Sequence, residues 1–324
     1  MGEGGAGAHA GNHLSSVSVV TIAWRNERHA AGFASSLARA AEVAGGTPPE
    51  LVVVVNGQEG DAAAAVVCER LHHARVIRLD TNTGFSGGAN AGVAMATGDV
   101  IVVANLDLTF DDRFLAVLRR EAAGAAPWDL LAPRVLQGAG GEDAGVSRLT
   151  RSHRLAWVST APVAPTPVPG GNGACLVLRR GTLERRVADA GALFDPEYHS
   201  FNEDIDLFWW AARSGLVVRY VPDLQISHAL AGSFAGAHRF RDRPVDVQRR
   251  VMANYRVTVW KNASGPRDWL GWTLGEAVYG GQAAVFGRLA GVRAYAASWP
   301  EAVRTAAAIR RRRGRLRPPA TRPA

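Results

Sequence analysis

The sequence predicts an α/β fold with a mostly parallel central sheet, helices on both faces of the sheet and a C-terminal helical segment. Short apolar runs rich in β-branched residues alternate with segments of helical periodicity, which is typical of parallel strands joined by crossover helices. Polar residues directly follow several of these runs, where ligands bind in such sheets. The 324 residues, 47% hydrophobic and 20% charged, are sufficient for a large core.

Four apolar runs in the first third of the chain are predicted to be strands, the first of them buried. They are Val17 to Ala23, Leu51 to Val55, Val76 to Leu79 and Val100 to Ala104. The intervening segments with helical spacing are Ala30 to Val43, Ala62 to Leu71 and Ala89 to Ala96. This repeated order of strand and helix predicts that the four strands are parallel neighbours in one sheet.

The second half of the chain is less regular. A segment rich in Gly, Pro and Ser, from Leu136 to Pro169, is predicted to be a long loop. Strands are predicted over Cys175 to Leu178 and Leu216 to Val221, with a helix over Ile205 to Ser214 between them, and the pattern is helical beyond Pro266. The expected organisation is a flexible tail over 1–15, a main domain over 16–264, a helical extension over 265–308 and an Arg/Pro-rich tail over 309–324.

The net charge of +8 is concentrated near the C-terminus. Six arginines lie there: Arg310, Arg311, Arg312, Arg313, Arg315 and Arg317. A basic tail after a Trp-rich helical segment can contact an anionic membrane surface, or it can simply be solvated. Aromatic residues are not interleaved with these arginines, so a nucleic-acid partner is not expected.

Other features bear on the cellular location. Cys68 and Cys175 lie far apart in apolar surroundings, which disfavours a disulfide scaffold and a Cys-based zinc site and is typical of a reducing compartment. The N-terminal residues do not have the pattern of a signal peptide, and the sequence contains no apolar run long enough to span a bilayer. We expect a cytoplasmic protein, at most peripheral at the inner face of the cell membrane.

The segment from Asn82 to Gly92 is rich in glycine and precedes a predicted helix. Glycines allow close backbone approach, and backbone N–H groups before a helix can bind phosphate. The segment is not a Walker loop, because no Gly-Lys-Ser/Thr follows, and it lacks the Gly-x-Gly-x-x-Gly spacing of dinucleotide sites. The alternative is a tight turn between strand and helix without a ligand.

Asp107 comes directly after the fourth predicted strand, in the sequence Asn105-Leu106-Asp107. A carboxylate at a strand end near a Gly-rich loop can hold Mg²⁺ or Mn²⁺ that bridges a diphosphate. His228, which follows another predicted strand, is a candidate second ligand. The alternatives are that Asp107 caps a turn and that His228 is structural.

Three carboxylates, Glu203, Asp204 and Asp206, lie at the start of a predicted apolar helix. Acidic residues at a helix N-terminus are favoured by the helix dipole, which is the simplest explanation for them. The helix follows an aromatic-rich turn after Phe194-Asp195, so we expect these carboxylates to face a cavity. One of them can then serve as a general base that deprotonates a hydroxyl group.

Taken together, the motifs resemble family 2 glycosyltransferases of the GT-A fold, particularly the bacterial rhamnosyltransferase-like branch. The resemblance covers about Ser16 to Pro266. The motifs that carry it are Val19-Val20-Thr21 with Asn26-Glu27, Asn82-x-Gly84-Phe85-x-Gly87-Gly88-x-Asn90-x-Gly92, Asn105-Leu106-Asp107, Gly170-Gly171, Phe194-Asp195, Glu203-Asp204-x-Asp206-Leu207, His228 with Gly232-Ser233, and Asn254-Tyr255-Arg256 to Lys261.

The resemblance implies a site for a nucleoside-diphosphate sugar at the strand ends. Thr21 and Glu27 would lie near the nucleotide. The residues that would shape the pocket for the diphosphate and the base are Asn82, Gly84, Phe85, Asn90 and Asn105. Asp107 and His228 would hold the divalent metal, Mg²⁺ or Mn²⁺. The family usually has Asp-x-Asp or Asn-Pro-Asp at this motif, and here its last carboxylate, Asp107, is retained.

The resemblance also implies the chemistry. Asp204 would be the catalytic base, supported by Glu203 and Asp206, and the sugar would be transferred by a single displacement that inverts the anomeric carbon. The acceptor would be a hydroxyl group of a saccharide, a lipid-linked sugar or a small molecule. The sequence does not distinguish among these acceptors.

One departure from the family concerns the base-binding residue. The second strand of the family usually ends with an Asp that contacts the base, whereas Asn56 stands here. An amide can still hydrogen-bond a pyrimidine ring, so dTDP-rhamnose or a UDP-sugar is the favoured donor.

Two alternative functions remain. A Rossmann-type oxidoreductase would need a glycine fingerprint where Trp24 to Glu27 stand. A non-catalytic binding module with the same fold is the second alternative, favoured by the missing Asp.

Overall fold

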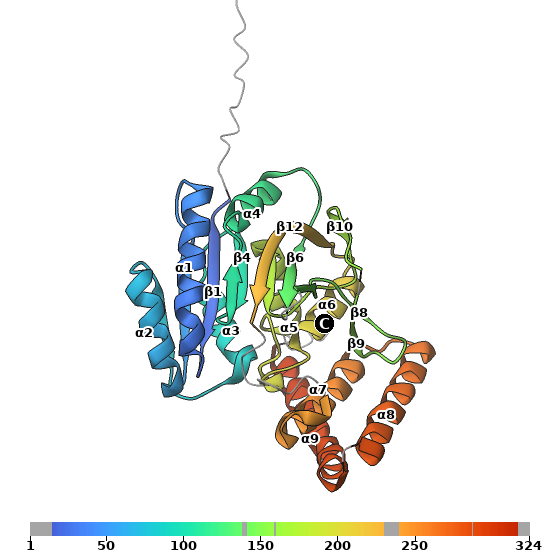
Figure 1. The fold of residues 1–324 in the computed structure, drawn as a ribbon. Helices are drawn as coiled ribbons and strands as arrows, with labels where there is room; N and C mark the ends of the chain where they lie inside the picture. Colours follow the sequence, from blue (N-terminus) through green and yellow to red (C-terminus); the bar gives the residue numbers. More distant parts are fainter. Residues whose placement is uncertain (1–14, 138–140, 159, 230–239, 287, 317–324) are drawn as a thin grey trace, which may run out of the picture.

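The computed structural model of the chain describes residues 15–137, 141–158, 160–229, 240–286 and 288–316 (Figure 1). The first third forms a parallel sheet in the order β4-β1-β2-β3. Its strands are β1 (Val17–Ala23), β2 (Glu50–Asn56), β3 (Arg75–Leu79) and β4 (Val100–Asn105). The connecting helices are α1 (Glu27–Ala44), α2 (Asp61–Arg70) and α3 (Gly84–Met95). All four predicted strands and three predicted helices are present.

The other half of the sheet continues from β4 in the order β11-β6-β12-β10. Its main strands are β6 (Leu130–Gln137), β11 (Cys175–Arg179) and β12 (Val218–His228). Strand β11 is antiparallel to both of its neighbours, whereas β6 and β12 are parallel to each other. The helices of this half are α4 (Phe114–Ala123), α5 (Arg180–Ala190) and α6 (Glu203–Arg213). The predicted mostly parallel sheet is confirmed.

Strand β12 continues beyond its predicted end at Val221 and finishes at His228. The strand was predicted to end at Val221 because Pro222 has no N–H group to donate to a neighbouring strand. The register with β6 shifts between Val221 and Gln225, so the proline is accommodated in an irregularity, and pairing resumes up to Gln137. The final residues of β12 also pair with β5 (Leu108–Phe110). His228 therefore lies on a strand end and not in a loop.

The segment predicted as a long loop, from Leu136 to Pro169, contains short strands. They are β7 (Glu142–Asp143), β8 (Ser147–Leu149), β9 (Leu155–Trp157) and β10 (Thr166–Pro167). Strand β7 pairs with β6, and β8 and β9 form a separate antiparallel hairpin. Strands this short carry little hydrophobic periodicity, so the sequence pattern does not distinguish them from loop.

Helices cover both faces of the sheet because successive residues of its strands point in opposite directions. On β1, Val19 belongs to a buried cluster that includes residues of α1, α2 and α4. Val20 belongs to the opposite cluster, formed with residues of α3, α5 and α6. Runs of valine in β2 and β4 are buried on both sides in the same way. This accounts for the nearly continuous apolar runs in the sequence.

The last third of the described chain is helical, as predicted. It comprises α7 (Val245–Asn262), α8 (Pro266–Phe286) and α9 (Arg288–Leu316), which Figure 1 shows at one end of the molecule in orange and red. Buried Arg256 on α7 joins them, because it pairs with Glu276 at 2.7 Å and its guanidinium lies 4.1 Å from the ring centroid of Trp299. Helix α9 continues without interruption past residue 308, where the tail was expected to begin. None of the described helices has the length and apolar character needed to cross a membrane.

Candidate active site

Asp107 and His228 meet at the carboxyl end of the sheet. The Nε2 atom of His228 lies 3.2 Å from Oδ1 of Asp107, and both side chains are about nine-tenths buried. Their backbones are joined by a hydrogen bond from the Ala229 N–H to the Asp107 carbonyl oxygen. The other ring nitrogen of His228 lies 3.3 Å from Nε2 of Gln137, at the end of β6. Three strand ends therefore contribute to one small polar cluster.

The donor set of this cluster fits part of a divalent-cation site. Burial raises the pKa of Asp107, but the hydrogen bond and charge of His228, together with the charge of His29, outweigh it, so the net pKa is lowered. A carboxylate and an imidazole are both ligands of Mn²⁺-type cations, and Gln137 can orient the ring through its other nitrogen. Among the described residues, no group of three or more His, Cys, Asp or Glu side chains is arranged to hold a metal. Asp107 and His228 would need phosphate or water oxygens to complete a coordination shell.

Asn56, at the end of β2, holds the Gly-rich segment. Its Nδ2 donates to Oδ1 of Asn82 at 3.1 Å and to the carbonyl of Gly84 at 3.0 Å. Its Oδ1 accepts from both the N–H and the hydroxyl of Thr83, at 2.9 and 3.1 Å. Both donors and both acceptor positions of this buried amide are thus filled from within the chain. Its direct effect is on the shape of the loop.

The N-terminal part of α3 packs against the segment that leads to the acidic run. Asn90 binds the backbone of Phe194 twice, with Nδ2 to the carbonyl at 2.8 Å and the Phe194 N–H to Oδ1 at 3.0 Å. The rings of Phe85 and Phe194 lie 5.9 Å apart. Gly84 has a positive φ of 74°, and a Cβ at this position would lie 2.2 Å from the carbonyl oxygen of His199. Glycine is required there for this close approach.

A strained turn delivers the acidic run to this surface. His199, Phe201 and Asn202 all have positive φ, at 59°, 74° and 70°, which costs L-residues about 1–3 kcal/mol each. The buried side chain of Asn254 on α7 stabilises the turn. Its Nδ2 lies 2.9–3.0 Å from the carbonyl oxygens of Tyr198, Ser200 and Phe201. Asn254 therefore fixes the backbone from which α6 begins.

Glu203 and Asp204 form the first turn of α6 and are close enough to affect each other's ionisation. Burial, with the neighbouring charge of Asp204, raises the pKa of Glu203 to about 8. Burial also raises the pKa of Asp204, although backbone N–H groups of Ile205 and Gly173 partly offset this. Within the described residues, neither carboxylate forms an ion pair with a basic side chain. At neutral pH Glu203 is therefore mainly protonated, and the pKa of Asp204 is raised in the same direction.

Gly173 brings Asp204 close to the metal motif. A Cβ on Gly173 would lie 2.5 Å from Oδ2 of Asp204, so glycine is required for the contact. The next residue, Ala174, accepts a hydrogen bond from the N–H of Asn105 at 2.9 Å. Asn105 ends β4, two residues before Asp107. The fold thus brings the acidic run and the strand-end cluster, which are about a hundred residues apart in sequence, to neighbouring positions.

Several residues predicted for the site lie elsewhere or outside the described chain. Thr21 is fully buried in β1, and its hydroxyl has no hydrogen-bond partner among the described residues. Glu27 is exposed in the first turn of α1. Gly232 and Ser233, which belong to the His228 motif, lie outside the described residues, as do 1–14 and 317–324 of the predicted tails.

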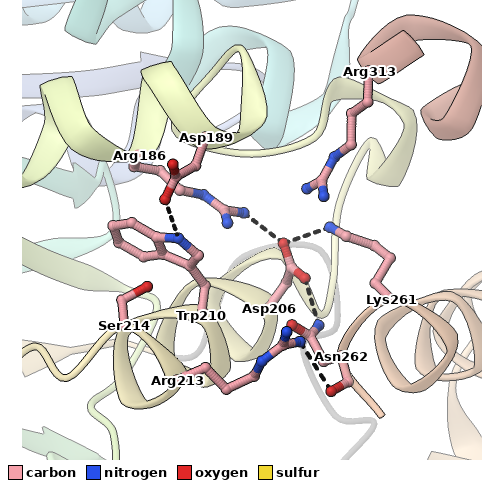
Figure 2. Close-up of a pocket in the computed structure, with 9 residues that line it drawn as sticks. All are labelled: Arg186, Asp189, Asp206, Trp210, Arg213, Ser214, Lys261, Asn262 and Arg313. Carbon is pink, nitrogen blue, oxygen red and sulfur yellow. Dashed lines mark hydrogen bonds and ion pairs between the residues drawn. The ribbon is translucent and has the colours of Figure 1, made fainter. Parts of the chain in front are cut away.

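Asp206 points away from Asp204, toward a polar cavity of about 270 Å³ between α5, α6, α7 and α9 (Figure 2). It pairs with Arg186 and with Lys261, both at 2.6 Å, and accepts from Asn262 at 2.8 Å. Burial alone would raise the pKa of Asp206, but the charges of Lys261 and Arg186 hold it well below its usual range. The side chain of Arg313, from α9, also reaches this cavity.

Asp195 extends the same charge network. It forms ion pairs with Lys261 and Arg312, and a further pair with Arg313 at 3.2 Å. Arg312 also pairs with Glu197 at 3.1 Å. Two arginines predicted to belong to a solvated or membrane-bound tail are therefore bound within the protein. The network ties the end of α9 to the segment before α6.

The sequence model of the family described as glycosyl transferase family 2 matches residues 18–185, slightly more than half of the chain. The chain belongs to glycosyl transferase family 2. The match ends before α6, so the acidic run and the helices after it lie beyond the matched residues. A comparison with curated proteins found no match.

Solved glycosyltransferase structures share the fold. Residues 1–349 of TarS from S. aureus, in complex with UDP-GlcNAc, align with a TM-score of 0.58 and 12% identity, covering 92% of each chain. The mannosyltransferase PcManGT from Pyrobaculum calidifontis, with GDP-Man and Mn²⁺, gives 0.53 and 16%, covering 94% of this chain and 81% of PcManGT. GalNAc-T7 with UDP, GalNAc and Mn²⁺ gives 0.54 and 15%, covering 84% of this chain and 58% of GalNAc-T7. The fold of this family 2 member is therefore GT-A.

Three contributors to the site were not assigned roles from the sequence. They are Gln137, Gly173 and Asn254, which contact His228, Asp204 and the turn before α6 respectively. Each acts across a long sequence separation, and none belongs to a residue class that indicates chemistry. The signals that could have found them are their places in the sequence, because Gly173 follows the Gly170-Gly171 motif and Asn254 begins the Asn254 to Lys261 motif.

Proposed function

We propose that this protein is an inverting glycosyltransferase that moves a sugar from a nucleoside-diphosphate sugar to a hydroxyl acceptor, with Asp204 as general base. The observation that supports this most strongly is the position of Asp204. Asp204 has no cationic partner within the described residues, and its pKa is raised. It packs against Gly173, and the next residue, Ala174, is hydrogen-bonded to Asn105 at the strand end that precedes Asp107. A base works best when its pKa is close to the working pH.

The donor would bind along the carboxyl ends of β2 and β4. The backbone N–H groups of the Gly-rich segment, held by Asn56 and Asn82, would face its phosphates. Asp107 and His228 would hold a divalent metal, and Mn²⁺ in two of the structural neighbours is consistent with this. Mg²⁺ or Mn²⁺ bound there supplies positive charge to the diphosphate.

Transfer would proceed in one displacement. The acceptor oxygen attacks the anomeric carbon while its proton passes to the carboxylate of Asp204. The bond from the anomeric carbon to the diphosphate oxygen breaks, and its electron pair leaves with the nucleoside diphosphate. Attack opposite the leaving group inverts the configuration. Neutral Glu203 avoids placing a second negative charge beside Asp204 as the acceptor approaches.

A pyrimidine nucleotide, in dTDP-rhamnose or a UDP-sugar, is the donor that we propose. The motif order of the rhamnosyltransferase-like branch supports it, and two of the three structural neighbours contain UDP or UDP-GlcNAc, while the third contains GDP-Man. Since the amide of Asn56 is fully hydrogen-bonded to the loop, it would select the base by shaping the pocket. The acceptor is a hydroxyl of a saccharide, a lipid-linked sugar or a small molecule.

The test begins with calorimetric titration of dTDP- and UDP-sugars and GDP-mannose, with and without Mn²⁺. The best donor is then incubated with the wild type and with Asp204→Asn, and release of nucleoside diphosphate and the anomeric form of the sugar are followed by NMR. We expect Asp204→Asn to bind the donor normally but to lower turnover about 10²–10⁴-fold. Asp223→Asn, on an exposed carboxylate, is the matched control.

Three outcomes would contradict the proposal. Near wild-type turnover by folded Asp204→Asn would exclude Asp204 as the base. Metal-dependent donor binding without hydrolysis or transfer by the wild type, with any acceptor, would indicate a non-catalytic sugar-nucleotide binding module. A product that retains the donor configuration would exclude the single displacement.

A further inference from the structure

The outer face of α8 is apolar along its whole length. Its exposed large side chains are Trp269, Leu270, Leu274, Val278 and Val285, followed at the start of α9 by Leu289 and Val292. Leu270 and Val285, near opposite ends of the helix, are 63% and 71% exposed. The intervals of four residues between Leu270, Leu274 and Val278 place these side chains on one stripe.

The opposite face of α8 is also apolar and is already buried. Tyr279 lies against Tyr255 of α7, with ring centroids 5.1 Å apart, and Gly275 lies directly against the Tyr255 hydroxyl. A helix that is apolar on all sides is normally covered on all sides. In α8 the inner half is covered by the protein, whereas the outer half is exposed.

The exposed charges of α8 and α9 are of one sign. Five arginines on α8 and α9 are exposed: Arg267, Arg293, Arg304, Arg310 and Arg311. The three carboxylates of the two helices are each partly or fully buried and internally engaged. Asp268 accepts from the Ser264 N–H, Glu276 pairs with Arg256 and Glu301 pairs with Arg249. The exposed surface therefore offers apolar and cationic groups without compensating carboxylates.

We propose that the outer face of α8, with the exposed arginines of α8 and α9, docks on a membrane surface that contains anionic lipid. The apolar side chains would enter the boundary between headgroups and acyl chains, and the guanidinium groups would contact lipid phosphates. Trp269 suits such a boundary because its ring is apolar and its N–H is polar. A second copy of this chain fits less well, since an isologous contact would bring the same arginines together.

This surface is connected to the acceptor side of the site. The tip of the β8–β9 hairpin packs on the start of α8, with Nε2 of His153 2.9 Å from the carbonyl oxygen of Asp268. At its base, the hydroxyl of Ser147 donates to the carbonyl of Gly171 at 2.7 Å, two residues before the Gly173 contact with Asp204. Figure 1 shows α8 and the hairpin on the same side of the molecule. A membrane-bound orientation would place a lipid-linked acceptor on the Asp204 side.

The structure also changes which arginines matter for membrane contact. Arg312 and Arg313 are engaged with Asp195 and Glu197 inside the protein. The membrane contact therefore rests on the α8 stripe and on arginines that point outward, and not on the whole basic cluster. It is independent of the proposed sugar transfer, and its test needs no donor or acceptor.

The test is co-sedimentation of the full chain with large vesicles of phosphatidylcholine, with or without phosphatidylglycerol. We expect the wild type to bind the anionic vesicles and to bind pure phosphatidylcholine much more weakly. Leu270→Gln/Leu274→Gln should weaken binding at least about tenfold, because two apolar side chains no longer enter the boundary. Arg304→Gln/Arg310→Gln should remove most of the preference for phosphatidylglycerol. Val163→Gln, at a 94% exposed valine in the loop before β10, is the matched control.

Circular dichroism in the absence of lipid would show that the variants are folded. Wild-type protein that does not bind anionic vesicles would overturn the proposal, as would vesicle binding unaffected by Leu270→Gln/Leu274→Gln. Sedimentation velocity supplies a third arm. A wild-type dimer that the same two substitutions dissociate would assign this face to a second copy of the chain and overturn membrane docking. A monomer that binds only anionic vesicles supports it.

Discussion

Two pairs of carboxylates lie within a stretch of twelve residues and have opposite surroundings. Glu203 and Asp204 have no cationic partner among the described residues, and both have raised pKa values. Asp195 and Asp206, each 1% exposed, are buried more deeply and are bound by Lys261 together with arginines from α5 and α9. The pKa of Asp206 is held well below its usual range.

The difference shows that burial alone does not determine what an acidic residue does. Burial disfavours the charged form in both pairs, and the outcome depends on whether cations outweigh it. Where they do, the carboxylate is fixed in its ionised form and joins elements together. Where they do not, the carboxylate can gain a proton near neutral pH, as a general base must. The comparison indicates a structural role for Asp195 and Asp206, and it supports the proposal that Glu203 and Asp204 act in the chemistry.

The largest effect should come from replacing one carboxylate of each pair and comparing the loss of stability. Asp206→Asn leaves buried Arg186 without its carboxylate and leaves Lys261 with Asp195 alone, and we expect it to lower the free energy of unfolding by about 3–5 kcal/mol. Asp204→Asn removes a carboxylate that is not ion-paired and should leave stability unchanged or slightly higher. Urea denaturation followed by tryptophan fluorescence measures both, with Asp223→Asn as the exposed control.

The comparison fails if the two substitutions destabilise the protein equally. It also fails if Asp206→Asn leaves the urea midpoint unchanged, since the network around Asp206 would then contribute nothing to stability. The urea midpoints can be compared as stabilities if the slope of free energy against urea concentration is the same for all variants.

A medium effect is expected at the turn that presents the chemical pair. Asn254→Ala removes the amide bonded to the carbonyls of Tyr198, Ser200 and Phe201. Leaving buried carbonyls without a donor costs about 1–3 kcal/mol. We expect turnover to fall at least about tenfold, because Asp204 loses its fixed position, while donor affinity changes little.

Donor calorimetry and nucleotide-release assays separate these two quantities. Thr273→Ala, at an exposed hydroxyl of α8, serves as a control for loss of a hydrogen-bonding side chain. Full turnover by Asn254→Ala would show that the strained turn keeps its shape without Asn254.

A pH-dependent effect is expected at Glu203. The pKa of Glu203 is raised from 4.5 to about 8 in the folded protein, so the folded state holds more protons than the unfolded state between these values. Stability should therefore fall as pH rises from about 4.5 to about 8. Glu203→Gln lacks this ionisation. The melting temperature of Glu203→Gln should exceed that of the wild type increasingly from pH 5 to pH 8.5.

Differential scanning fluorimetry across this range measures the gap, and Glu42→Gln, at an exposed position on α1, is its control. A gap that does not change with pH would mean that Glu203 ionises as readily in the folded as in the unfolded protein. We also expect Glu203→Gln to keep more turnover than Asp204→Asn, because the proposed role of Glu203 needs only its neutral form.

The fold was predictable from the sequence where apolar periodicity was strong. The strands β1, β2 and β4 are buried on both faces, and such apolar runs can be recognised in the sequence alone. Strand β6 was not predicted, since Pro133 interrupts it. The structure places Pro133 opposite Val221, where the register with β12 shifts, so a proline is tolerated there. Irregular pairing of this kind depends on both strands and leaves no local signal.

The site was predictable in its residue types but less so in its contacts. Asp107 and His228 were placed together from motif order, and the structure confirms that they are neighbours. Asn56 was expected to contact a base, but its amide is filled by Asn82, Thr83 and Gly84. Asp206 was expected to support Asp204 and instead faces Lys261. Side-chain direction at these positions is set by helices that follow much later in the chain.

The pairing of Asp195 with Arg313 has a consequence for the order of events during synthesis. The two residues are 118 positions apart, so at 5–20 residues per second a ribosome needs about 6–24 s to reach the second after the first. During that time the strands of the matched family region can already assemble, while Asp195 still lacks its arginines. The nascent protein therefore acquires its sheet first and closes its last ionic contacts only as α9 is completed.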